Sequence, residues 1–185
     1  MALTPAVTLR PLRPGDEEAA VRWAADPEFC RAADWTPGLA PRLVRDHWRR
    51  VTASVGPDFL RLGVEAGGRL VGYVDLADLT PSSGEFGIGL GERALWGRGV
   101  GTAAGRQMLA HAFGPLGLER VTAQVHAPNL RSHALMRRLG FREVGRGQPE
   151  VYRGAVAEVL RYEVTRGEWD GGPGRSEGKG PSPFA

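Results

Sequence analysis

A strand that runs into a glycine-rich loop constrains the fold of this chain more than any other feature. Residues 84–90 (GEFGIGL) predict a β-strand, and residues 96–102 (WGRGVGT) predict a loop that leads into a helix at 101–113. Gly99 and Gly101 carry no Cβ atom, so the backbone of this loop can turn tightly and approach a ligand closely. The segment therefore predicts a strand–loop–helix unit with a ligand at the start of the helix.

The predicted helix start favours an anionic ligand. The backbone N–H groups of Val100, Gly101 and Thr102 have no partner within the helix. Unpaired donors and the positive end of the helix dipole together attract phosphate or pyrophosphate. Arg98 adds a formal positive charge at the same rim.

Two common phosphate-binding loops fit this segment poorly. A nucleoside triphosphate P-loop ends in Gly-Lys-Ser/Thr, but Lys179, far from the loop, is the only lysine of the chain. A dinucleotide fingerprint matches Gly99-x-Gly101-x-x-Ala104 by letter, and it requires an acidic residue at the end of the next strand. Glu119 precedes that strand instead, so the dinucleotide reading is a minor alternative.

The sequence after the first helix continues the alternation of strand and helix. Residues 121–126 (VTAQVH) are rich in β-branched residues and predict a strand, and residues 130–139 predict a helix that Asn129 could cap. Gly140 ends that helix, and Phe141 opens a further strand.

These segments resemble the Gcn5-related N-acetyltransferase (GNAT) family. Trp96 stands where the family loop has glutamine or arginine, which is a departure, but Trp-Gly-x-Gly resembles the RimJ/RimL-like branch that acetylates N-termini of ribosomal proteins. The run from Asn129 to Phe141 resembles the second signature of the family. Residues 9–17 resemble its first strand and helix, and residues 160–169 resemble its last strand. The matches lie in the family's order and cover most of residues 7–169.

The resemblance implies one α/β domain of the α+β type at residues 1–169, with a mixed, mostly antiparallel seven-stranded sheet flanked by helices. Residues 170–185 are rich in glycine and proline, and we expect a disordered tail there. The strands are expected at 7–12, 59–66, 69–77, 84–90, 120–126, 141–146 and 157–165, and the helices at 16–25, 41–53, 101–113 and 130–139, with an irregular stretch between the first two helices.

The resemblance also implies acetyl-CoA as co-substrate and a primary amine as acceptor, with no covalent enzyme intermediate and no metal. The pantetheine arm would lie between two splayed strands near Leu90, with Asn129 beside the thioester. The pyrophosphate would bind residues 98–102, that is, Arg98, Gly99, Val100, Gly101 and Thr102. A backbone N–H between Ile88 and Leu90 is the candidate donor to the oxyanion.

Two side chains are candidates for proton transfer. Glu85, at the start of the splayed strand, is the candidate base; alternatively it is a solvated carboxylate or the partner of an arginine. Ser132 is the family-position candidate for the acid that protonates the leaving thiolate, and its alternative role is local capping or packing. Tyr152, expected in a loop before the last strand, is a reserve donor.

The acceptor is less constrained than the co-substrate. A protein N-terminal α-amine is favoured by the branch, and the alternatives are an aminoglycoside, a polyamine or an amino acid. Trp35, in the irregular stretch, is expected to contact ligand, whereas Trp23 and Trp48 are expected in the core. Three acids of the same region would suit a cationic acceptor or simply be surface charge: Asp26, Glu28 and Asp34.

Composition sets further limits. No run of 18 apolar residues and no secretory signal are visible, and Cys30 is the single cysteine, so we expect a cytoplasmic protein. The formal charge is +3, and the arginines of 42–50 are a solvated helix face or a surface for an acidic partner such as the ribosome. No aromatic interleaving supports binding of nucleic acid.

The remaining hypotheses concern metal binding, the cysteine, the class of the protein and its assembly. The four histidines lack metal-ligand spacing, and Cys30 is expected as a buried residue rather than a nucleophile. A non-catalytic acyl-CoA-binding module is the alternative to an enzyme. The family resemblance also implies a homodimer.

Overall fold

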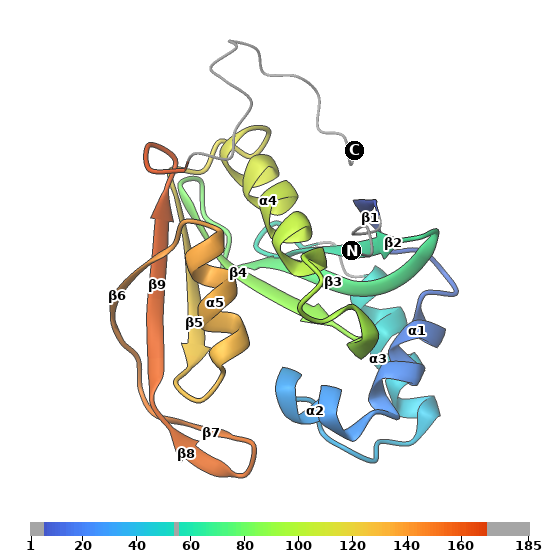
Figure 1. The fold of residues 1–185 in the computed structure, drawn as a ribbon. Coiled ribbons are helices and arrows are strands. Elements are labelled where there is room, and N and C mark those ends of the chain that lie inside the picture. Colours follow the sequence, from blue (N-terminus) through green and yellow to red (C-terminus); the bar gives the residue numbers. More distant parts are fainter. Residues whose placement is uncertain (1–5, 54–55, 170–185) are drawn as a thin grey trace.

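The protein is built around a seven-stranded sheet, seen here in a computed structural model that describes residues 6–53 and 56–169 (Figure 1). The strand order is β1-β2-β3-β4-β5-β9-β6. Each neighbouring pair is antiparallel except β4 and β5, which are parallel. The strands are β1 (Val7–Pro11), β2 (Leu60–Ala66), β3 (Arg69–Ala77), β4 (Ser83–Leu90), β5 (Arg120–His126), β6 (Arg142–Arg146) and β9 (Val159–Thr165).

Helices cover both faces of the sheet. One face packs against α4, which also contacts α5, and the N-terminal helices pack on the other face over β3. The helices are α1 (Glu17–Ala24), α2 (Pro27–Ala33), α3 (Pro41–Ala53), α4 (Val100–Phe113) and α5 (Leu130–Arg138), with a 3-10 turn, η1, at Arg93–Leu95. The mixed, mostly antiparallel sheet and its flanking helices confirm the predicted fold.

Strand β3 divides the interior into two cores because successive side chains of a strand point to opposite faces. Val74 and Leu76, both fully buried, belong to the core beneath α4. Tyr73, which directly precedes Val74, points the other way and belongs to the core beneath α1 and α3. Burial on both faces explains why this strand has an almost continuous apolar sequence.

The second core is an aromatic cluster, made of Trp23, Phe29, Trp35, Trp48 and Tyr73. The rings of Trp48 and Tyr73 meet edge to face at 5.6 Å, and the indole Nε1 of Trp35 donates a hydrogen bond to the Tyr73 hydroxyl at 3.1 Å. Trp23 and Trp48 are each 1% exposed, which confirms their expected place in the core.

Two glycines form the turn between β2 and β3. Gly67 and Gly68 have φ of 59° and 74°. Positive φ at both central residues is the requirement of a type I′ hairpin turn, and glycine meets it without steric cost.

Helix α2 corrects the prediction of an irregular stretch between the first two helices. The Asp26 carboxylate accepts hydrogen bonds from the N–H groups of Glu28 (3.0 Å) and Phe29 (3.4 Å), and Pro27 occupies the first turn. An aspartate cap followed by proline is a standard helix start. The signal was present in the sequence, but the helix is only seven residues long.

A short hairpin corrects the predicted strand at 157–165. Strands β7 (Glu150–Tyr152) and β8 (Ala155–Ala157) pair with each other, and β9 begins only at Val159. The turn between them has positive φ at Arg153 (55°) and Gly154 (83°). Tyr152 therefore lies on a strand and not in the expected loop.

The parallel pair β4 and β5 positions the site. The two strands pair only over Ser83–Glu85 and Arg120–Thr122. Beyond Glu85, β4 remains paired with β3, and β5 remains paired with β9 as far as His126. Because each strand follows its outer neighbour, a gap opens between their C-terminal ends. The predicted domain extent of 1–169 stays a prediction, and the predicted tail at 170–185 lies outside the described residues.

The close packing of β4 on the aromatic cluster predicts a selective stability loss. A Cβ at Gly89 would lie 2.6 Å from the Tyr73 ring, which its neighbours hold in place. We expect Gly89→Ala to lower the free energy of unfolding by about 1–3 kcal/mol, measured by urea denaturation.

The matched control lies two residues earlier on the same face of β4. A Cβ at Gly87 would meet nothing closer than Asp75 Cβ, at 3.7 Å, so Gly87→Ala should retain wild-type stability. Equal losses in the two variants would show that the tyrosine contact is not the cause.

Candidate active site

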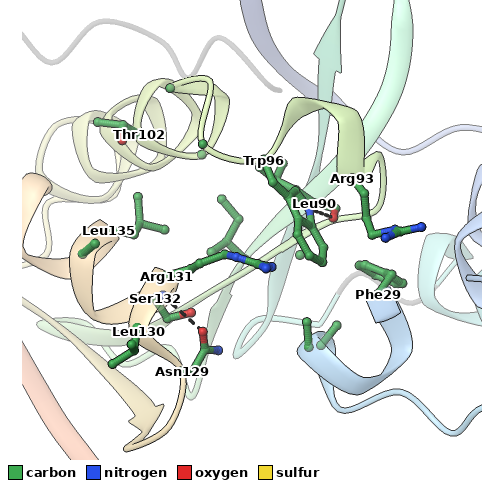
Figure 2. A pocket seen from close by; sticks show the side chains of 18 of the residues that line it. Phe29, Leu90, Arg93, Trp96, Thr102, Asn129, Leu130, Arg131, Ser132 and Leu135 are labelled. Carbon is green, nitrogen blue, oxygen red and sulfur yellow. Dashed lines mark hydrogen bonds between the residues drawn. The ribbon is translucent and has the colours of Figure 1, made fainter. Parts of the chain in front are cut away.

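The gap between β4 and β5 opens into a cavity of about 720 Å³ (Figure 2). Its walls are the end of β4, the glycine-rich loop, one face of α5 and one face of α2. The residues that line it include Glu28, Phe29, Ala32, Ala33, Ile88, Leu90, Trp96, Gly99, Gly101, Thr102, Asn129, Arg131, Ser132, Leu135 and Arg138. The cavity thus extends from the start of α4 to the N-terminal helices.

The end of β4 presents unpaired backbone groups to this cavity. Gly91 donates its N–H to the Val71 carbonyl at 2.9 Å, which continues the antiparallel ladder of β4 with β3. Because ladder hydrogen bonds alternate along a strand, Gly89 also faces β3. Ile88 and Leu90 then direct their N–H and C=O groups toward the gap, where β5 no longer pairs. These N–H groups are the predicted contacts for a pantetheine arm and an oxyanion, and that role stays a prediction.

Trp96 forms a hydrogen bond with one of these backbone groups. Its indole Nε1 donates a 2.7 Å hydrogen bond to the Leu90 carbonyl, as Figure 2 shows. The departure from the family's glutamine or arginine therefore has a structural role, because the indole fixes the loop against the end of β4. This hydrogen bond uses the Leu90 carbonyl and leaves the N–H groups of Ile88 and Leu90 out of the contact.

The glycine-rich loop ends in the helix start that the sequence predicts. Gly99 caps α4 in the left-handed conformation (φ 82°) without a side-chain hydrogen bond. The first hydrogen bond of the helix runs from the Ala103 N–H to the Gly99 carbonyl, at 2.9 Å. Three preceding N–H groups have no intrahelical acceptor, those of Val100, Gly101 and Thr102.

The predicted loop residues differ in what they can offer a ligand. Gly99, Gly101 and Thr102 line the cavity. The Val100 side chain is fully buried in the core, so that residue can contribute only its backbone N–H. Arg98 is exposed, and its side chain is not part of the cavity wall. The part of the predicted loop that reaches the cavity is therefore mainly backbone.

Two arginines that the sequence analysis missed supply the positive charge. Arg106 and Arg138 line a second hollow of about 380 Å³ at the start of α4. Gly97, Gly99, Thr102 and Arg138 line both hollows, so the two adjoin. A row of free N–H groups beside two guanidinium groups suits a polyphosphate.

The start of α5 distinguishes the roles of Asn129 and Ser132. The Asn129 Oδ1 accepts the Ser132 N–H at 3.2 Å, so Asn129 is the helix cap. The Ser132 hydroxyl makes no hydrogen bond within the described residues, and both side chains line the cavity (Figure 2). Capping thus does not occupy the Ser132 hydroxyl, which remains available to a ligand.

Glu85 lies where β4 and β5 separate. It is the last β4 residue paired with β5, opposite Thr122, and its Oε2 accepts a hydrogen bond from Gln124 Nε2 at 3.1 Å. Its side chain shares the face of Gly87 and does not line the cavity. The role of Glu85 as base stays a prediction.

Helix α2 forms the end of the cavity opposite the glycine-rich loop. Phe29, Ala32 and Ala33 present an apolar surface there, with Glu28 beside them. Trp35, expected to contact ligand, packs within the aromatic cluster and is not part of the cavity wall. This end, which we call the acceptor end because the sequence analysis expects the acceptor near these residues, is made by a helix that the sequence analysis did not predict.

Tyr152 connects the β7–β8 hairpin to α2. Its hydroxyl donates to the Ala32 carbonyl at 3.3 Å, and its ring stacks on His126 with centroids 4.4 Å apart. The hydroxyl is thus engaged with α2, and Tyr152 does not line the cavity. The contact joins the C-terminal half of the chain to the N-terminal helices.

Three further features concern the part of the chain that the structure describes: membrane-spanning helices, metal sites and the cysteine. No helix there is long and apolar enough to cross a membrane, and no three His, Cys, Asp or Glu side chains gather there as a metal site. Cys30 is fully buried, its thiol lies 3.4 Å from the Ala24 carbonyl oxygen, and burial raises the thiol pKa. A buried, protonated thiol is a poor nucleophile.

Comparisons with known proteins agree with this geometry. The Acetyltransferase (GNAT) domain family matches residues 6–142. The "Putative ribosomal N-acetyltransferase YdaF" of Bacillus subtilis is 32% identical over 130 residues, which cover 67% of this chain and 68% of that protein.

Solved structures share the same architecture. Mycobacterium smegmatis RimJ in complex with CoA-disulfide superposes with a TM-score of 0.77 at 26% identity, covering 88% of this chain and 84% of RimJ. A spermidine N-acetyltransferase from Vibrio cholerae in complex with CoA and spermine gives 0.75 at 21% identity, covering 88% and 96%. The second likeness supports the fold alone.

The arginines at the start of α4 predict a specific loss of affinity. Arg138 lines both hollows, and replacing it with glutamine removes a charge-assisted contact to phosphate. We expect Arg138→Gln to weaken binding of CoA by about tenfold in calorimetric titration, which corresponds to about 1.4 kcal/mol.

Arg137 provides the matched control because it neighbours Arg138 but lines neither hollow. Arg137→Gln should bind CoA with wild-type affinity. If the two variants bound equally well, the phosphates would lie elsewhere.

Proposed function

The chain belongs to the GNAT family of acetyl-CoA-dependent N-acetyltransferases, and we propose that its acceptor is the α-amine of a protein N-terminus. The observation that carries the proposal is the 32% identity to a relative named as a ribosomal N-acetyltransferase, over two thirds of both chains. The RimJ likeness supports the same choice. The polyamine acetyltransferase is less similar in sequence.

In this proposal, acetyl-CoA lies along the cavity with its phosphates at the start of α4. The free N–H groups of Val100, Gly101 and Thr102 and the Arg138 guanidinium would hold the pyrophosphate. The pantetheine arm would follow the gap toward Asn129. The thioester would then lie beside the N–H groups of Ile88 and Leu90.

The chemistry requires the acceptor nitrogen to bond to the thioester carbonyl carbon while the carbon–sulfur bond breaks. The N–H groups of Ile88 and Leu90 would donate to the oxyanion that forms on the carbonyl oxygen. The amine proton would pass to Glu85, directly or through a water, and the thiolate would take a proton from Ser132. Such direct transfer needs no nucleophile from the chain.

A pair of peptides tests the acceptor. One has a free α-amine and no lysine, and the other has a blocked N-terminus and one lysine, both with otherwise identical sequences. We expect thiol release from acetyl-CoA only with the first peptide, and a mass increase of one acetyl group on its N-terminal residue. Turnover of spermidine but of neither peptide would contradict the proposed acceptor, and binding of acetyl-CoA without turnover of any amine would indicate a binding module.

The proton-transfer roles predict a second result. Glu85→Gln and Ser132→Ala should each lower kcat by about 10²-fold or more, the usual range for removing a general acid or base, with little change in acetyl-CoA affinity. Turnover measured at neutral and alkaline pH separates the two roles, because loss of a base matters least where the amine is already deprotonated.

Glu119→Gln is the control for the charge change, because Glu119 is exposed and precedes β5 outside the cavity. Its turnover should match that of the wild type. Near-full turnover of Glu85→Gln and Ser132→Ala at every pH would remove both residues from the mechanism.

A further inference from the structure

Helix α5 contributes two arginines to the wall of the cavity. Arg131 and Arg138 both line it, with Leu135 between them on the same face. Seven residues of α-helix span about 10 Å. Because Arg138 lies at the start of α4, Arg131 lies about that far along the cavity toward α2.

A ring contact and an electrostatic effect on Glu28 indicate where Arg131 lies. Its guanidinium carbon sits 4.3 Å from the centre of the Trp96 ring, and Figure 2 shows the side chain extending across the cavity toward that ring. The pKa of Glu28, on α2, is held below its usual range mainly by a hydrogen bond from Arg31, and the charge of Arg131 contributes to the same shift. Arg131 therefore lies within the cavity between Trp96 and α2.

The acids of the acceptor end are already engaged by other arginines. Glu28 pairs with Arg31 at 3.0 Å and with Arg153 at 3.6 Å. Asp26 caps α2 and also pairs with Arg93. The third acid of this region, Asp34, is exposed and does not line the cavity. Little unpaired negative charge is therefore left at these acids to attract a cationic acceptor, as one hypothesis expected.

Arg131 differs from those arginines in lacking an acidic partner. Within residues 6–53 and 56–169 its guanidinium makes no salt bridge and no hydrogen bond, and its recorded partner is the Trp96 ring. A guanidinium that stacks on an aromatic face keeps its N–H edge open to a carboxylate. The indole is itself fixed by the Leu90 carbonyl, so Arg131 has a firm support.

We propose that Arg131 binds a carboxylate of the acceptor close to the reacting amine, so that the enzyme favours protein N-termini with an acidic second residue. The inference rests on the proposed function and refines its substrate class. Arg131 precedes Ser132 in the first turn of α5, so an acceptor held by Arg131 would have its amine near the reacting thioester. A polyamine, which carries no anionic group, would meet an unpaired positive charge.

The test uses three peptides with free α-amines that differ only at the second residue, Asp, Asn or Lys, together with spermidine. Wild-type kcat/KM should be about tenfold higher for the Asp peptide than for the Asn peptide, and lowest for the Lys peptide. Arg131→Gln should reduce the value for the Asp peptide to that for the Asn peptide, mainly through KM. Arg131→Lys should keep part of the preference, and Arg131→Glu should favour the Lys peptide.

Two controls accompany the kinetics. Arg137→Gln, on the same helix but outside the cavity, should keep the wild-type preference. Acetyl-CoA titrations and thermal melts of each Arg131 variant should match the wild type, which separates loss of acceptor recognition from misfolding or loss of the co-substrate.

Each contrary outcome has a distinct meaning. Equal turnover of the Asp and Asn peptides by the wild type would overturn the role of Arg131 and leave the proposed function intact. Weakened acetyl-CoA binding by Arg131→Gln would overturn it as well, because Arg131 would then be a ligand of the co-substrate. Turnover of spermidine but of no peptide would contradict the proposed function itself.

Discussion

The site depends on the short parallel pairing of β4 and β5. Each strand is held by a long antiparallel ladder on its outer side, β4 by β3 and β5 by β9, while only three residue pairs join the two. Parallel neighbours also require a crossover, and α4 provides it. Because the outer ladders determine the strand directions, the gap is a stable part of the fold, and it leaves the N–H groups of Ile88 and Leu90 without strand partners.

The two cores hold this gap open from both sides. Beneath α4, Val100 anchors the helix start in the main core, which fixes the row of N–H groups that follows Gly99. On the opposite face, Tyr73 packs against Gly89 and ties β4 to the aromatic cluster. The functional groups of the site are therefore mostly backbone, positioned by side chains that do not themselves contact the cavity.

Sequence reasoning succeeded where local backbone conformation decides the structure. The helix start after Gly99 and the cap at Asn129 follow from residues adjacent in the chain, and the fold class follows from the family resemblance. It failed where residues from distant segments form the site together. Arg106 and Arg138 come from different helices, and neither has a local signature of phosphate binding. Trp35 was assigned to ligand contact because its segment looked irregular, whereas α2 and Tyr73 bury it in the aromatic cluster. Glu85 and Ser132 lie near the gap as expected, but position alone does not establish catalysis.

The hydrogen bond from Tyr152 to the Ala32 carbonyl has a consequence for the shape of the cavity. It ties the β7–β8 hairpin to α2, and thereby joins the two halves of the chain on the side of the cavity away from the glycine-rich loop. Ala32 itself lines the cavity. The position of that wall therefore depends on a contact between residues 120 positions apart in the sequence.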